Sequence, residues 1–197
     1  MLSLSFRHSL QTDLTVSHMI YMFIAEGFEE IEALCPLDLM RRAGLEVKTV
    51  GIGGTSITGA HGITVKTDIA DTDFSYGTPQ MIFLPGGMPG TLNLAASSVV
   101  TDAIASANKD GIYIAAICAA PSILGDMGLL QGKSAVCYPG FEDRLTGATI
   151  PSQKVVLDGT VLTAKGMGAA LEMGLKIVEI FCGETSANEL RHAVIAD

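Results

Sequence analysis

Residues 112–126, IYIAAICAAPSILGD, place an unbroken apolar strand directly before a cysteine and a short helix. Small alanines flank Cys118 and let the backbone turn sharply, and Pro121 is tolerated because it falls in the first turn of the helix. The segment therefore predicts a strand-to-helix elbow, like the strained turn that presents the serine of α/β-hydrolases. A thiol at a helix N-terminus lies near free N–H groups and the positive end of the dipole, so we expect a low thiol pKa and a reactive thiolate. By itself, however, the segment also suits a buried structural cysteine.

On both sides of this elbow, apolar β-rich runs alternate with segments of helical period, which is typical of a parallel sheet covered on both faces. We expect strands at residues 19–25, 45–50, 81–85, 112–117 and 135–138, hairpins at 51–68 and 155–166, and helices at 28–43, 98–108, 119–127, 169–181 and 187–194. No linker, repeat or low-complexity stretch interrupts this pattern. The predicted fold class is α/β, a three-layer sandwich with a mostly parallel central sheet, formed by a single domain over residues 19–197.

The composition excludes several classes of protein. At 197 residues, 48% apolar and 17% charged, the chain can bury a substantial core as one domain. Its formal charge of −9 argues against binding to nucleic acid or to an anionic membrane surface. No window approaches the roughly 18 consecutive apolar residues of a membrane span. Four cysteines form no CxxC pair and have no His at ligand spacing, so we expect free thiols in the cytoplasm and no metal site; they are Cys35, Cys118, Cys137 and Cys182.

The first 18 residues differ from the rest of the chain. They contain Arg7, His8 and Asp13 and no continuous apolar run, so they make a poor signal peptide. We interpret residues 1–18 as an extension, which we expect to be poorly ordered, or as the product of an upstream start codon, with the domain beginning near Met19.

A glycine pair follows another predicted strand. In LPGG, residues 84–87, Gly86 and Gly87 let backbone N–H groups approach a ligand at the carboxyl edge of the sheet, where doubly wound folds bind ligands. With the N–H of Ala119, these groups could form an oxyanion hole. The alternative is an ordinary tight turn.

A carboxylate faces the predicted core. On a helical wheel, Glu32 lies near the middle of the apolar arc of the helix at 28–43, where it must be neutralised or paired. We expect burial to raise its pKa and to make it an acid–base partner of Cys118. The alternative is a side chain that escapes to solvent at the first turn.

Four segments and their spacing resemble the ThiJ/PfpI superfamily, and within it the subfamily of the Parkinsonism-associated protein deglycase and its bacterial relatives: GFEEIEALCPLDLMRRAG, LPGGMPGTLNL, AAICAAPSIL and LTAKGMGAALEMGLKIVE. The resemblance implies a flavodoxin-like sandwich that forms a homodimer. It also implies that Cys118 is the nucleophile and that Glu32 is the acid that hydrogen-bonds it. Gly87 and Ala119 match the amides that polarise the substrate, and Arg42 matches an arginine near the dimer interface and the site.

The chain departs from parts of this family. Some members carry a His directly after the nucleophile, where this chain has Ala119, and the human-type branch has a His where this chain has Tyr138. Cys-His hydrolysis of amides is therefore not supported, and neither is protease activity. Tyr138 could line the site and donate a hydrogen bond, but a phenol with a pKa of about 10 is a poor proton shuttle at neutral pH.

Two functions use the same residues. In the first, Cys118 adds to the aldehyde of methylglyoxal or glyoxal and Glu32 moves a proton to give a hydroxy acid, as in a glyoxalase III-like lyase or a protein deglycase, with no metal or organic cofactor. In the second, the protein is a redox sensor or a chaperone-like stress protein whose Cys118 oxidises to a sulfinate. Because both need the same thiol and carboxylate, the sequence leaves them open.

Overall fold

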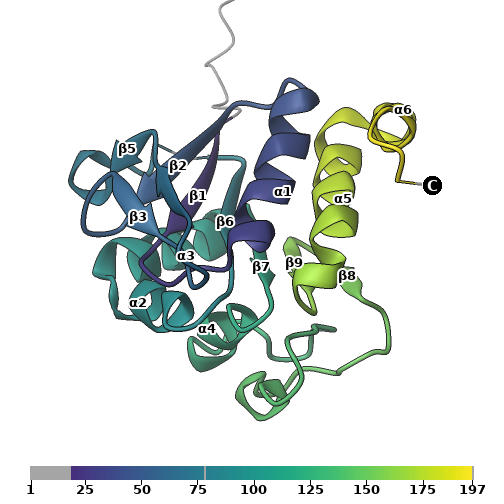
Figure 1. Cartoon of the computed structure of the whole chain (residues 1–197). Coiled ribbons are helices and arrows are strands. Elements are labelled where there is room, and N and C mark those ends of the chain that lie inside the picture. The colour runs from purple at the N-terminus through teal and green to yellow at the C-terminus, as the bar shows by residue number, and fades with distance from the viewer. Residues whose placement is uncertain (1–18, 78, 197) are drawn as a thin grey trace, which may run out of the picture.

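A seven-stranded sheet forms the middle layer of the protein (Figure 1). The structure is a computed structural model that describes residues 19–77 and 79–196, so the predicted extension at 1–18 lies outside the described residues. Across the sheet the strands are β5 (Ile69–Ala70), β2 (Val47–Gly51), β1 (Ile20–Ile24), β6 (Met81–Leu84), β7 (Tyr113–Ile117), β9 (Val161–Ala164) and β8 (Val155–Asp158). Each neighbouring pair is parallel except β8 with β9, which confirms the mostly parallel sheet.

Helices cover both faces of this sheet (Figure 1). One face carries α1 (Glu30–Arg42) and α5 (Ala170–Cys182), and the other carries α2 (Gly90–Ala96), α3 (Ser98–Asp110) and α4 (Pro121–Asp126). The last helix, α6 (Glu184–Ala193), packs on α5. A small hairpin of β3 (Ser56–Thr58) and β4 (Thr64–Lys66) projects beside α1, and three short 3₁₀ turns are η1 (Asp71–Asp73), η2 (Glu142–Arg144) and η3 (Met167–Ala169).

Two apolar clusters fill the space between the layers. Along β1, Phe23 belongs to the cluster under α2, α3 and α4, whereas Met22 and Ile24 belong to the cluster under α1 and α5. This alternation arises because successive side chains of a strand point to opposite faces, so that each central strand contributes to both cores. The three-layer sandwich that the apolar runs predict is therefore confirmed. Among the described residues, no helix is long and apolar enough to cross a membrane.

One predicted strand is wrong. Residues 135–138 have the apolar character of a strand, but none of them belongs to a strand of the sheet. Their N–H groups find partners outside a ladder: Val136 donates to the Thr163 hydroxyl over 3.0 Å, and Tyr138 donates to the carbonyl of Cys118 over 2.7 Å. These two hydrogen bonds therefore hold the segment against β9 and the elbow.

Candidate active site

Cys118 forms the elbow between β7 and α4 and has a φ of 64°, in the left-handed region. Its N–H donates to the carbonyl of Ala164 at the end of β9 over 2.9 Å, and its carbonyl accepts from Tyr138. These two bonds satisfy the backbone polar groups of a conformation that costs a residue with a side chain about 1–2 kcal/mol. The predicted backbone strain at the elbow is confirmed.

Glu32 points from the first turn of α1 toward the sulfur and is only 1% exposed. Its carboxylate accepts hydrogen bonds from the Cys118 thiol and from the N–H of Met167, and the N–H of Gly86 donates to its Oε2 over 3.1 Å. The side chain of Glu29 caps the helix by accepting from the N–H of Glu32 over 2.7 Å, which fixes this first turn. A carboxylate is tolerated in the core because these donors replace its water.

The glycines of LPGG allow the backbone to approach both groups. A Cβ on Gly86 would lie 2.6 Å from the Cys118 Cβ and 2.6 Å from Glu32 Oε2, so only hydrogen fits at this position. The N–H of Gly86 is directed to Glu32, whereas the N–H groups of Gly87 and Ala119 hydrogen-bond the sulfur. The structure thus brings together the five central residues that the sequence singles out, while their chemical roles stay predictions.

The pKa of Cys118 differs in direction from the sequence-based expectation. Burial, the charge of the ionised Glu32 and the hydrogen bond that the thiol donates to it raise the pKa of Cys118 to about 12, although the N–H groups of Gly87 and Ala119 oppose this rise. The expectation of a low thiol pKa is therefore wrong for Cys118 beside an ionised Glu32. The expectation relied on the helix N-terminus and on a hydrogen bond from a neutral Glu32, but α4 has only six residues, and the removal of the sulfur from water was left out.

Glu32 and Cys118 share one proton over a wide pH range. Burial raises the pKa of Glu32 to about 7, even though the hydrogen bond from Cys118 lowers it. Between pH values of about 7 and about 12, the pair therefore holds a single proton, which rests on the sulfur. Transfer of this proton to Glu32 would leave a thiolate beside a neutral acid that donates back to it. The geometry thus allows proton exchange between Cys118 and Glu32, as the predicted acid–base role of Glu32 requires.

The structure places Tyr138 next to Cys118 and Arg42 at the far end of α1. Tyr138 is 52% exposed, and its backbone bond to Cys118 holds it next to the elbow. Arg42 ends α1 and pairs with Asp38 over 2.6 Å, about 15 Å of helical rise beyond Glu32. Tyr138 therefore borders the site, whereas Arg42 does not line it.

The segment after β9 completes the site, and sequence reasoning assigned it no role. A Cβ on Gly166 would lie 3.7 Å from Glu32 Oε1 and 3.3 Å from the Tyr138 ring, so the backbone of this residue passes between them. The next residue, Met167, supplies the N–H that binds Glu32. A groove of about 380 Å³ opens along this segment and Tyr138. Two glycines directly after a strand, in KGMG (residues 165–168), are the signal that could have revealed it.

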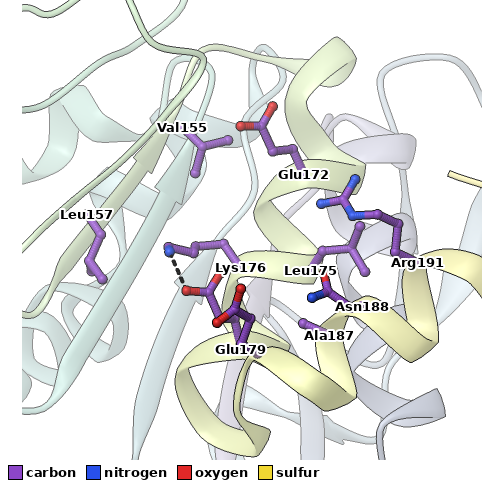
Figure 2. Close-up of a pocket in the computed structure, with 10 residues that line it drawn as sticks. Val155, Leu157, Glu172, Leu175, Lys176, Glu179, Ala187, Asn188 and Arg191 are labelled. Carbon is purple, nitrogen blue, oxygen red and sulfur yellow. Dashed lines mark hydrogen bonds and ion pairs between the residues drawn. The ribbon is translucent and has the colours of Figure 1, made fainter. Parts of the chain in front are cut away.

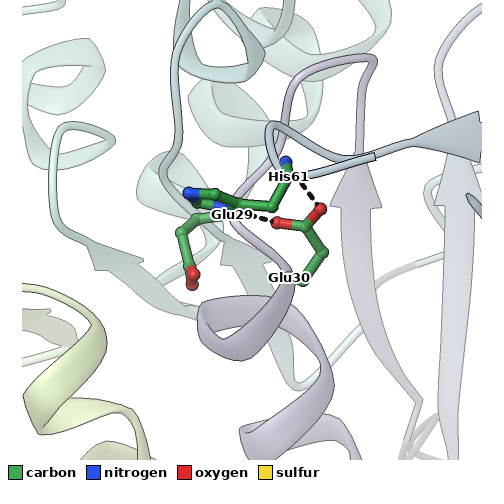
Figure 3. A group of neighbouring side chains, drawn as sticks. All are labelled: Glu29, Glu30 and His61. Atoms are coloured by element: carbon green, nitrogen blue, oxygen red, sulfur yellow. Dashed lines mark hydrogen bonds and ion pairs between the residues drawn. The ribbon is translucent and has the colours of Figure 1, made fainter. Parts of the chain in front are cut away.

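Glu29, Glu30 and His61 form a cluster next to the site (Figure 3). Their potential ligand atoms lie within 4.8 Å of one another, so the three could contribute to a cation site. However, the Glu30 carboxylate already accepts from the N–H of His61 over 2.8 Å, from its Nδ1 over 2.9 Å and from the N–H of Ile63 over 3.3 Å. These hydrogen bonds therefore connect the first turn of α1 to the loop of the β3–β4 hairpin.

A second hollow, of about 320 Å³, lies between α5, α6 and the edge strand β8 (Figure 2). The ion pair between Lys176 and Glu179, at 2.7 Å, lies within it. Acidic and basic side chains both line this hollow, and none of the candidate site residues does. This hollow is therefore separate from the Cys118–Glu32 pair, whereas Tyr138, which borders that pair, also lines the groove along residues 165–169.

The structure thus defines a class of protein by its fold and its site: a three-layer α/β sandwich in which a cysteine on a strand-to-helix elbow contacts a buried carboxylate. The chain belongs to the DJ-1/PfpI family, whose model matches residues 18–180. It is 32% identical over 183 residues to protein dj-1beta of Drosophila melanogaster, covering 91% of this chain and 98% of that protein. It is 34% identical over 167 residues to the glutathione-independent glyoxalase DJR-1.2 of Caenorhabditis elegans, covering 84% and 89%. The structure of oxidised Toxoplasma gondii DJ-1 superposes with a TM-score of 0.83 at 30% identity, over 91% of this chain and 98% of that one.

The strain at the elbow predicts an unusual order of stability. We expect Cys118→Gly to be more stable than Cys118→Ala by about 1 kcal/mol, because glycine adopts a positive φ without steric cost. Urea unfolding of both variants measures the difference. The matched control is Cys137, which is buried without a positive φ, so that Cys137→Ala should be more stable than Cys137→Gly. Equal stability of the two Cys118 variants would contradict the strain.

The shared proton predicts how the thiol responds to Glu32→Gln. We expect this change to lower the pKa of Cys118 relative to wild type, because it removes the charge that raises it. The thiolate absorbance at about 240 nm, as the difference from Cys118→Ser, follows the titration. Glu172→Gln, at an exposed position on α5, is the control and should leave the titration as in wild type. A Cys118 pKa that does not fall in Glu32→Gln would show that the two groups are not coupled.

Proposed function

We propose that this protein is a cofactor-independent enzyme that converts small dicarbonyls, such as methylglyoxal and glyoxal, into 2-hydroxy acids. The observation that carries the proposal is the buried contact between the Cys118 thiol and the Glu32 carboxylate, whose pKa of about 7 suits proton transfer at neutral pH. The name of the C. elegans relative, a glutathione-independent glyoxalase, supports the same chemistry.

The first step is the addition of sulfur to the aldehyde carbon, C1. Glu32 takes the thiol proton, a bond forms between sulfur and C1, and the carbonyl oxygen becomes an oxyanion near the N–H groups of Gly87 and Ala119. Glu32 then gives the proton to that oxygen. The result is a neutral hemithioacetal and an ionised Glu32, ready to act again as a base.

The second step moves hydrogen from C1 to C2. Glu32 removes the C1 proton to give an enediolate and returns it to C2, while the proton on the C1 oxygen passes to the C2 oxygen. C1 is thereby oxidised and C2 reduced, so no external oxidant is needed. Water then cleaves the resulting thioester, which releases the 2-hydroxy acid and restores the Cys118 thiol. On a glycated protein, Cys118 would displace the modified thiol or amine from C1: the bond from sulfur to C1 forms, the bond from C1 to the protein group breaks, and that group leaves with the proton that Glu32 took from Cys118. The same hemithioacetal then continues to the 2-hydroxy acid, which would amount to protein deglycation.

A redox sensor is the second candidate, and the N–H groups of Gly87 and Ala119 around the sulfur favour it. Peroxide would convert the thiol to a sulfenic acid and water, and a second peroxide would give a sulfinic acid and water. A protonated Glu32 could donate to the sulfinate. The Toxoplasma relative is described in an oxidised form. Both candidates need a free thiol, so we place the protein in a reducing compartment such as the cytoplasm.

Substitutions of Glu32 separate the two functions. If Glu32 moves protons, Glu32→Gln should reduce methylglyoxal turnover about 100-fold or more, because the amide keeps the shape but exchanges no proton. Glu32→Asp shortens the reach by one methylene and should weaken turnover without abolishing it. Peroxide should still oxidise Cys118 in Glu32→Gln, since the amide can donate to a sulfinate. Loss of methylglyoxal with formation of the hydroxy acid measures turnover, and mass spectrometry measures oxidation.

The pH dependence provides the control for this series. The active form has Glu32 ionised and Cys118 protonated, so turnover should rise as pH rises through about 7 and then level off. Glu32→Asp should retain such a rise, and the residual turnover of Glu32→Gln should lack it. A wild-type protein that oxidises readily but turns over no dicarbonyl would favour the redox sensor.

We also propose that two copies of the chain pair through α1 and the β3–β4 hairpin. Ile31 on α1 is 47% exposed and Ile63 in the hairpin is 54% exposed. The N–H of Ile63 donates to Glu30, which precedes Ile31, so the two apolar side chains belong to adjoining elements. A two-fold interface would repeat this patch on both copies, and a stable one buries more than about 1,000 Å².

The interface predicts the behaviour of charged variants. Light scattering at micromolar concentration should return twice the 20.6 kDa of one chain. Ile31→Glu with Ile63→Glu should return the mass of one chain, because it places four carboxylates in the interface. Ile195→Glu is the control, since Ile195 is 90% exposed near the end of the chain and its replacement should leave the pair intact. A wild-type mass near that of one chain would refute the pairing.

A further inference from the structure

The groove along Tyr138 and residues 165–169 is larger than a three-carbon dicarbonyl requires, with a volume of about 380 Å³. Two of its lining residues adjoin the reactive pair: the Tyr138 N–H donates to the Cys118 carbonyl, and a Cβ on Gly166 would lie 3.7 Å from Glu32 Oε1. Its walls include the apolar side chains of Pro139, Met167 and Ala169. A substrate that carries a short methylene chain on its carbonyl group could therefore extend along the groove while its aldehyde carbon meets the sulfur.

Two lysines stand in this groove, although the chain carries a formal charge of −9. Lys154 and Lys165 both line it, and no lining residue is acidic. The carboxylate of Glu142 accepts from the N–H of Gly140 over 2.6 Å, and Glu142 is not among the residues that line the groove. The groove thus carries positive charge that no carboxylate of its own lining neutralises.

The two lysines are neighbours because of the sheet. The antiparallel register of β8 and β9 pairs Val155 with Ala164, and the next pair outward is Lys154 with Lys165. The N–H of Lys165 donates to the carbonyl of Lys154 over 3.0 Å. Like charges at directly opposite positions on one face of a sheet are destabilising, so the repulsion between these two ammonium groups lowers the stability of the fold unless a ligand offsets it. An anion bound between them would supply it.

The same strand connects the lysines to the chemistry. Ala164, whose carbonyl holds the Cys118 N–H, directly precedes Lys165, and the Lys165 Nζ is steadied by the carbonyl of Ser152 at 2.9 Å. Because each ammonium group has three donors, Lys165 keeps two for a ligand. Lys154 has no partner among the described residues, so all three of its donors are available.

We propose that Lys154 and Lys165 form an anion subsite that selects 2-oxoaldehydes with a carboxylate at the end of a short methylene chain. This inference rests on the proposed function, which it deepens by naming the substrate class. The methylene chain lies along Met167 and Pro139, and the carboxylate lies between the two ammonium groups.

Two probes of matched shape test the subsite. They are 4,5-dioxopentanoate, which carries the carboxylate, and 2-oxopentanal, which has a methyl group in its place. In the wild type we expect kcat/KM to favour the carboxylate probe by about tenfold, and we expect this ratio to fall as salt is raised. Lys154→Met with Lys165→Met should bring the ratio close to one, and Lys154→Met alone should lower it part of the way. Lys109→Met, on α3, should keep the wild-type ratio.

A second measurement does not need turnover. Iodoacetate and iodoacetamide alkylate Cys118 and differ mainly in charge, so the ratio of their rates reports the field of the groove. We expect the double lysine variant to lower this ratio about tenfold and Lys109→Met to leave it as in wild type. Unchanged ratios in the double variant and in Lys154→Met would overturn the subsite. A lowered alkylation ratio with no turnover of either probe would support the subsite and refute the proposed function.

Discussion

The hydrogen bond between the Cys118 thiol and the buried Glu32 carboxylate is the constraint to which the rest of the site is fitted. The carboxylate can lie in the core only because the N–H groups of Gly86 and Met167 also bind it, and these come from the loops after β6 and β9. Gly86 must lack a side chain for the sulfur and the carboxylate to approach each other. The parallel sheet brings the carboxyl ends of β6, β7 and β9, which carry Gly86, Cys118 and Met167, to one edge.

This site costs the fold stability. The pKa of Glu32 is raised from 4.5 to about 7, so the folded protein prefers the carboxyl group protonated. The free energy of unfolding is therefore not reduced by this group below a pH of about 4.5. It falls by about 3 kcal/mol as the pH rises from about 4.5 through about 7, because the buried carboxyl group resists ionisation. The positive φ of Cys118 adds about 1–2 kcal/mol. Such costs are typical of catalytic and switch sites, where the surrounding structure maintains a reactive arrangement.

Local charge and overall charge have opposite signs in this protein. The net charge of −9 argues against polyanionic partners, yet it says nothing about a groove that holds Lys154 and Lys165 and no acidic lining residue. A small anion responds to the nearest groups, because the field of distant surface charges is screened within about 8–10 Å at physiological salt. A groove with a local positive charge is therefore compatible with a chain that is acidic overall.

Sequence alone determined the features that depend on near neighbours along the chain. The apolar runs predicted the sandwich, the apolar strand before Cys118 predicted the elbow, and the helical wheel placed Glu32 in the core. Tertiary structure decided the rest, because those features depend on distances between remote segments. Residues 135–138 form no strand, since Val136 and Tyr138 donate to Thr163 and Cys118. The N–H that Met167 donates to Glu32 comes from the segment after β9, which is remote from α1 in the sequence. The pKa of Cys118 rises because burial and the Glu32 charge act on the sulfur at once, and neither can be read from residues 112–126.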